Sequence, residues 1–217
     1  MRVSTSKSEA MVLCRKKVDC SLQVGSESLS QVEEFKYLGV LFTSEGRMEC
    51  EIDRRTGSAS AVMQALCRTV VAKRELSLKA KLSIYRSIYI TTLTYGHELW
   101  VVTERMRSRI QAAEISFLRR VAGLSLRDRV RSSDIQGELG VEPLLLRIER
   151  SQLRWFGHLL RMPPGRLPLE VFQARPTGRR PRGILRLRWR DYISRLAWER
   201  LGIPQEELEN VAGEREV

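Results

Sequence analysis

The spacing of apolar residues changes near residue 48, and this change constrains the fold more than any other feature. Before it, the short runs MVLCRKK, CSLQV and FKYLGVLF are separated by turn formers such as Gly25 and Gly46, a pattern typical of strands. After it, apolar residues recur at steps of three and four, as on one face of a helix. We therefore expect an α+β fold that is mainly α, with a small β-hairpin or three-stranded piece over residues 1–46. A two-stranded hairpin is marginal in water, so this piece needs the helices or a further sheet to cover it.

The first helices are predicted from their stripes and caps. One apolar stripe consists of Ile52, Thr56, Ala59, Met63, Leu66 and Val70. A second helix begins near Ser77, which is a good N-cap residue. A third is capped by Thr103 and stops at Gly123, since glycine readily takes the left-handed conformation that ends a helix.

A fourth helix begins at Pro143, which we place in its first turn. Its stripe consists of Leu145, Ile148, Gln152, Trp155, Leu159 and Met162. A large indole on such a stripe predicts that Trp155 is a core anchor. The bundle is thus expected over residues 47–162, followed by a Pro-, Gly- and Arg-rich linker over 163–183 and a helical segment over 184–217, whose last helix is acidic and opens at Pro204.

The charge of the chain indicates its class of partner. The net charge is +12 and the isoelectric point is near 10.1, which favours a polyanion such as nucleic acid or an anionic membrane surface. No stretch approaches the roughly 20 apolar residues of a membrane span, and the first residues lack the apolar core of a secretory signal. We therefore expect a nuclear or cytoplasmic protein that does not enter a membrane.

Residues for catalysis or metal binding do not form any recognisable set. Polymerases use paired aspartates to hold two metal ions, but the sequence has no Asp-Asp pair, and it has no Walker loop, GxSxG or HExxH motif. Its four cysteines are scattered without a CxxC pair, so no zinc site can be assembled at the usual spacing. We expect no catalytic residue, no metal site and no cofactor.

Two groups of arginines are candidates for nucleic-acid binding. After Lys81 every basic residue is arginine, whose planar fork binds phosphate; biased residue usage on a solvated surface is the alternative. The first group combines arginines with an aromatic residue that can stack on bases: Arg175, Arg179, Arg180, Arg182, Arg186, Arg188, Trp189 and Arg190. A solvated basic linker or a nuclear-import signal would look the same. The second group forms either a groove wall or exposed helix ends: Arg119, Arg120, Arg127, Arg129 and Arg131.

Several segments, in order along nearly the whole chain, carry a family resemblance. They are FKYLGVLFTSEG, EIDRR, IYRSIYITTLTYGHELW, LRRVAGLSLRDRVRSSDI, LRWFGHLLRMP and GRRPRGILRLRWRDYI. Together they resemble the recurring blocks of the palm edge, thumb and post-thumb region of non-LTR (LINE-type) retrotransposon reverse transcriptases. The resemblance implies that residues 47–162 are a thumb-like bundle that holds a template–primer duplex.

The same resemblance implies roles for particular residues. Phe35, Tyr37, Leu38 and Gly39 would lie at the primer-side edge of the palm. A second block, Tyr95, Gly96, Glu98 and Trp100, would serve packing, and Gly157 would permit a close helix contact. The family's aspartates and their Mg²⁺ belong to palm motifs that this sequence does not contain.

Three interpretations remain open at this point. The first is a non-catalytic fragment of an RNA-directed DNA polymerase that binds an RNA/DNA hybrid or RNA, with a palm domain as a further partner. The second is a domesticated helical module that binds another protein, with the Arg-rich segment as a nuclear-import signal. The third is an enzyme subunit that works in trans with a separate palm.

Overall fold

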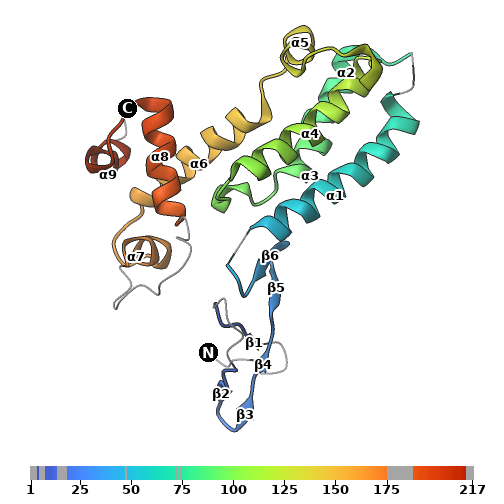
Figure 1. Ribbon diagram of the computed structural model, residues 1–217. Coiled ribbons are helices and arrows are strands. Elements are labelled where there is room, and N and C mark those ends of the chain that lie inside the picture. The colour runs from blue at the N-terminus through green and yellow to red at the C-terminus, as the bar shows by residue number, and fades with distance from the viewer. Residues whose placement is uncertain are drawn as a thin grey trace. The chain divides into compact units, whose positions relative to one another are not determined.

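The computed structural model describes residues 4, 8–13, 19–46, 48–71, 73, 75–174 and 188–213. The chain forms two compact units, Met1–Tyr95 and Gly96–Val217, and each unit is described by itself (Figure 1). Short strands precede a succession of helices, which confirms the expected α+β, mainly α class. The boundaries predicted after residues 46, 162 and 183 stay predictions.

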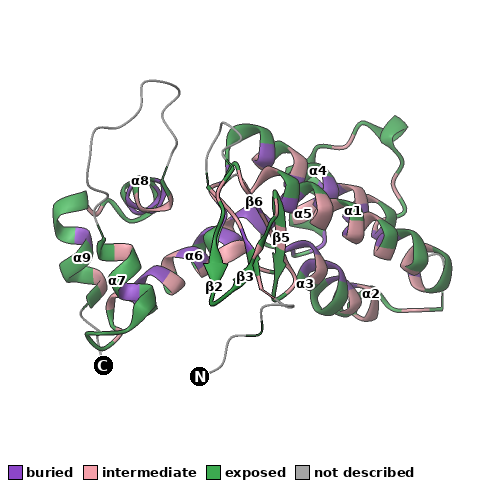
Figure 2. Cartoon of the chain, turned by 90° about the horizontal axis from the view of Figure 1, so that it is seen from below, coloured by how far each residue is buried: buried purple, intermediate pink, exposed green. Residues whose placement is uncertain are grey.

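The strands of the first unit pair two by two. β1 (Glu9–Ala10) is parallel to β4 (Ser30–Gln31), while β2 (Gln23–Val24) and β3 (Glu27–Ser28) form a small antiparallel ribbon. The longest pair is the hairpin of β5 (Glu34–Tyr37) and β6 (Val40–Thr43). Figure 2 shows β2 and β3 exposed along their length, and only β6 includes a buried residue among the strands of the two hairpins. Of the two predicted forms, a hairpin or a three-stranded piece, the hairpin is therefore the one observed among the described residues.

The first helix of this unit packs against the second strand of the hairpin. α1 (Glu49–Leu66) continues into a wider turn, η2 (Cys67–Val71), and packs against β6 and α3 (Ile90–Leu93). α2 (Leu78–Ile84) runs through the wide turn η3 (Tyr85–Tyr89) into α3. The Ser77 side chain accepts a hydrogen bond from the backbone of Ala80 at 3.2 Å, which confirms the predicted cap.

The second unit is built around α6 (Leu144–Leu160). Against it pack η4 (His97–Leu99), α4 (Glu104–Val121), α7 (Leu167–Gln173), α8 (Trp189–Leu201) and α9 (Gln205–Gly213). The short helices η5 (Leu126–Asp128) and α5 (Ser132–Glu138) lie between α4 and α6 along the chain. Thr103 caps α4, and Gly123, with φ of 72°, follows its end. Both predictions are confirmed.

Gln152 is a polar hub in the core of the second unit. Its fully buried amide donates to the carbonyls of His97 and Trp100 at 2.9 and 2.8 Å and accepts from the Tyr192 hydroxyl at 3.0 Å. A buried amide with several partners fixes the elements that supply them. Gln152 therefore joins α6 to η4 and α8.

Three local predictions need correction. Trp155 is half-buried and packs against His158, while Phe156 is the buried aromatic, because a step of four from Gln152 keeps the stripe in phase and a step of three does not. Pro143 has ψ of 130° and precedes the first helical residue. The atoms nearest to a Cβ at Gly157 belong to Arg161, beside the same helix rather than on a facing one.

The described part of the segment predicted as a linker has local structure, and the linker itself stays a prediction. This part contains α7, which has a proline in its first turn and a buried Leu169 facing α6. Composition alone missed this helix because its apolar face is only about two turns long.

Among the described residues no helix is long and apolar enough to cross a membrane.

Candidate nucleic-acid interface

A hollow on the outer side of α4 is the first candidate site. It has a volume of about 650 Å³ and lies between the second half of α4 and the segment that leads to α5. Its walls include Ala112, Ser116, Arg119, Arg120 and Gln136. We call this hollow the α4 groove. Ala112 and Ser116 are the small α4 residues of its lining, which also includes the apolar Ile115, Leu124 and Leu126.

Arg119 shapes the loop that borders the α4 groove. Its guanidinium donates to the carbonyl of Val130 at 2.5 Å and to that of Ser125 at 3.4 Å. Asp128 closes the turn by accepting from the Ser125 backbone at 2.5 Å. This bond and a second one from the Ser125 side chain lower the pKa of Asp128, and the Arg119 charge lowers it further. Arg119 therefore works mainly as a clamp on the loop.

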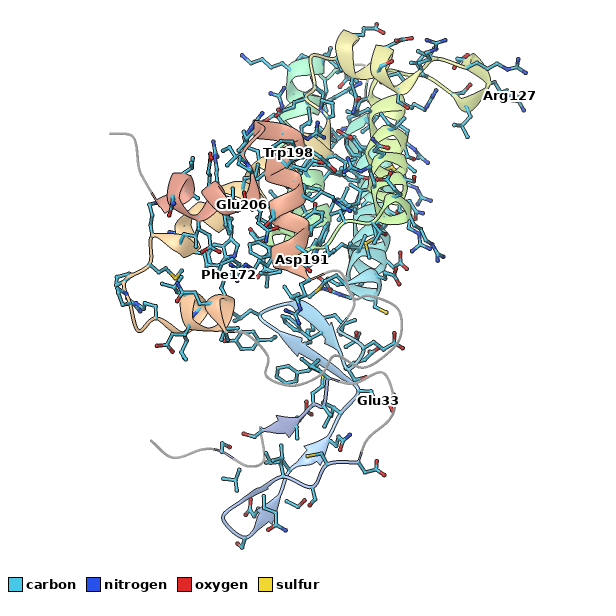
Figure 3. All side chains as sticks on the ribbon, turned by 60° about the vertical axis from the view of Figure 1, so that its left-hand side comes forward. Glu33, Arg127, Phe172, Asp191, Trp198 and Glu206 are labelled. Carbon is cyan, nitrogen blue, oxygen red and sulfur yellow. The ribbon has the colours of Figure 1, made fainter. Side chains whose placement is uncertain are left out.

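The other arginines of this group remain available to a ligand. Arg120, Arg127, Arg129 and Arg131 are all exposed, and none forms an ion pair with another described residue. Figure 3 shows Arg127 pointing away from the helices at the far end of the loop. The structure thus has a groove wall at Arg119 and Arg120 and exposed cations on the loop beyond it. That these arginines contact nucleic acid stays a prediction.

Buried carboxylates fix the inner side of α4. Glu114 is fully buried and accepts from the first backbone amide of α6, at Leu144, and from the Gln136 amide, both at 3.1 Å. Glu149 on α6 accepts from Arg107 at 3.1 Å and from Arg200 at 2.8 Å. Because α4 is held from inside, its outer face has a defined shape before any ligand arrives.

Most of the Arg-rich segment is outside the described residues. This applies to Arg175, Arg179, Arg180, Arg182 and Arg186. Of the remainder, Trp189 donates its indole N–H to the Glu98 carbonyl at 2.9 Å and lies against Phe156 and Phe172. This indole is used in packing, and its predicted stacking on bases stays a prediction. Arg188 is exposed at the start of α8.

The predicted palm-edge block forms a held hairpin tip in the first unit. Leu38 and Gly39 make the two-residue turn with φ of 47° and 81°, and the rings of Phe35 and Tyr37 stack beside it at 6.4 Å. Positive φ at both turn positions matches the twist of a β-hairpin, but it strains a leucine.

Side chains from the helices hold both carbonyls of this turn. The Tyr95 hydroxyl donates to the Leu38 carbonyl at 2.7 Å. Arg54 and Arg55 donate to the Gly39 carbonyl at 2.6 and 2.5 Å. The side chain of Leu38 is 73% exposed. The leucine therefore projects into solvent from a turn whose two carbonyls are held by hydrogen bonds.

Glu51 organises the two arginines. It is fully buried and accepts from the Leu41 backbone at 2.9 Å, from Arg54 at 2.9 Å and from Arg55 at 2.7 Å. Arg55 also lies over the Tyr95 ring at 4.5 Å. The sequence analysis missed this cluster as a unit, although the spacing of one glutamate and two arginines at i+3 and i+4 was a visible signal. No group of three or more potential metal ligands occurs among the described residues.

Comparison with known proteins gives one informative similarity. The chain is 28% identical over 170 residues to a putative uncharacterized transposon-derived protein of Caenorhabditis elegans. The match covers 76% of this chain and 60% of that protein, so the chain spans less than two thirds of the relative's length. No family model matches, and no solved structure matches. The similarity indicates a transposon-related origin.

Proposed function

We propose that this chain is a non-catalytic part of a retrotransposon-derived RNA-directed DNA polymerase that binds a template–primer duplex at the α4 groove. The observation that carries the proposal is the set of four exposed arginines that form no ion pair within the described part of the chain, one lining the α4 groove and three on the loop beside it. The resemblance of its sequence blocks to the thumb region and the transposon-derived relative support the same origin. Since the sequence has no Asp-Asp pair, the polymerase chemistry would belong to another domain.

The groove suits the backbone of a duplex rather than its bases. Ala112 and Ser116 let a sugar–phosphate backbone approach α4 closely, and Arg120 with the loop arginines can reach the phosphates on either side. Phosphate contacts position a protein on nucleic acid without reading sequence. Binding of this kind releases counterions, and each neutralised phosphate contributes about 0.7–0.9 to the slope of log affinity against log salt.

The test is fluorescence anisotropy of the purified chain with a labelled RNA–DNA hybrid over a salt series. We expect linear weakening in the log–log plot. The triple variant Arg120→Gln, Arg127→Gln, Arg131→Gln should bind more weakly and lower the slope by about 2, because up to three contacts are removed.

A charge-matched control separates a site from general attraction. Arg154, Arg166 and Arg195 are exposed elsewhere in the second unit, and changing them to glutamine removes the same charge. This control should keep the wild-type slope within about 0.5, less than one phosphate contact. A folded wild-type chain that shows no binding, or two triple variants with equal slopes, would overturn the proposal.

The protein-interaction module is the second candidate. One observation favours it: Trp198 and Leu201 on α8 are 61% and 57% exposed, and tryptophan is enriched at the centres of protein interfaces. For this function we expect association with a protein that persists at high salt and is lost in Trp198→Ala. Binding to nucleic acid with a steep salt dependence, unchanged by Trp198→Ala, argues against it.

A further inference from the structure

The last helix of the described chain is acidic and lies on the last arginine of the Arg-rich segment. α9 carries Glu206, Glu207 and Glu209, and the carboxylate of Glu209 forms a short ion pair with Arg190. A hollow of about 400 Å³ at this contact is lined by Arg190, Gln205, Glu206 and Glu209. The arginine that ends the basic run therefore already has an anionic partner within the chain.

Two arginines hold α9 in place. At its middle, Glu209 engages Arg190, whose guanidinium also lies over the Phe172 ring at 5.1 Å. At its far end, Arg161 donates to the Ala212 carbonyl at 2.7 Å, where a cation suits the negative end of the helix dipole. Leu208 is buried between them. This attachment keeps the acidic face of α9 beside the start of α8.

The remaining carboxylates of α9 are exposed. Glu206 and Glu207 are open to solvent and form no ion pair with any other described residue. Figure 3 shows Glu206 on α9 in the same region of the second unit as Phe172 and Asp191. Glu206 and Glu209 lie one helical turn apart, on one face of α9, and both line the hollow at Arg190, so their carboxylates present negative charge to this arginine as phosphates of a nucleic-acid backbone would. The Arg190 donors that Glu209 occupies are not open to a phosphate until Glu209 leaves them.

We propose that α9 is an autoinhibitory element that competes with nucleic-acid phosphates for Arg190. This inference rests on the proposed nucleic-acid binding and adds a regulation to it. A phosphate approaching Arg190 must displace Glu209 and overcome repulsion from Glu206 and Glu207. Screening by salt weakens both effects together, so the inhibition is strongest at low ionic strength.

The experiment compares two triple variants of the full chain, again with the RNA–DNA hybrid as the probe. The first variant is Glu206→Gln, Glu207→Gln, Glu209→Gln. It removes the three negative charges of α9 while keeping the shape of the side chains and the buried Leu208. The control is Glu27→Gln, Glu34→Gln, Glu75→Gln, at three glutamates that are exposed in the first unit. It alters the net charge equally. We expect the α9 variant to bind about two- to fivefold more tightly than the control, the effect of losing an exposed ion pair.

A second comparison assigns the effect to Arg190. With Arg190→Gln in both triple variants, the advantage of the α9 variant should disappear, because the two groups act on one contact. Equal affinities of the α9 variant and the control, or an advantage that survives Arg190→Gln, would overturn the inference and leave the proposed function standing. A folded wild-type chain that binds no hybrid would overturn both.

Discussion

The buried carboxylate of Glu51 offers the sharpest test of how the hairpin tip is held. In Glu51→Gln the two guanidiniums of Arg54 and Arg55 keep their places but lose the negative charge between them. Removing one partner of a buried ion pair costs about 3–5 kcal/mol. Because the side chain of Arg54 is 31% exposed and that of Arg55 is 11% exposed, we expect the low end, about 3 kcal/mol.

Glu49→Gln is the matched control for this change. Both glutamates lie in the first turn of α1, so both variants lose the same favourable interaction with the helix dipole, about 0.3–1 kcal/mol. Only Glu51 is bound to Leu41 and the two arginines. The difference between the variants therefore isolates the buried cluster.

Native-state amide hydrogen exchange measures this difference in stability at the β5–β6 hairpin itself. A loss of about 3 kcal/mol raises the exchange rate of the β5–β6 amides about 100-fold, since about 1.4 kcal/mol corresponds to a factor of ten. The control should raise it by no more than about fivefold. If Glu51→Gln accelerates exchange by less than about tenfold, or no more than Glu49→Gln, the cluster does not hold the hairpin and the reasoning fails.

Two further predictions test the strained turn and the core tyrosine. Leu38→Asn should slow exchange of the hairpin about three- to fivefold, because asparagine tolerates the left-handed conformation that costs leucine about 1 kcal/mol; Leu38→Ala, which keeps that cost, should give no slowing. Burial, and then the charge of Glu149, raise the pKa of Tyr192 from 10.0 to about 12. The unfolded chain therefore loses this proton first as the pH rises, and the stabilisation present below pH 10 is lost between pH 10 and 12. We expect the free energy of unfolding to fall by up to about 2.7 kcal/mol over this range, measured by urea titration with tryptophan fluorescence. Tyr192→Phe should remove that part of the slope, and equal slopes for the two proteins would contradict the prediction.

Local signals in the sequence were enough to predict three helix ends. Ser77, Thr103 and Gly123 act through bonds or backbone angles within a few residues of themselves, so their neighbours in sequence determine what they do. The exchange of Trp155 for Phe156 shows the limit of this approach. A stripe read in steps of three and four loses its phase after several turns, and only the packing partner decides which of two adjacent aromatics is buried.

The polar hubs were not predictable in the same way. Gln152 finds its partners 40 to 55 residues away along the chain, and no local pattern distinguishes it from a solvated glutamine. The cluster at Glu51 was partly visible, because its two arginines lie three and four residues later. Its burial and its hold on Gly39 depend on a hairpin that precedes the helix, which only the fold brings into contact.

The arginines show why a net charge cannot locate a binding site. Arg54 and Arg55 are used on Glu51, and Arg107 and Arg200 on Glu149, so donors of these cations are already occupied inside the units that they stabilise. Arg119 has no carboxylate partner but directs its guanidinium to two loop carbonyls. By contrast, Arg120, Arg127, Arg129 and Arg131 project into solvent without an ion pair among the described residues. A polyanion therefore meets a positive field from the whole chain, but a donor already bound within the fold must be released before it can bind phosphate. The four arginines at the α4 groove and on its loop do not carry that cost among the described residues.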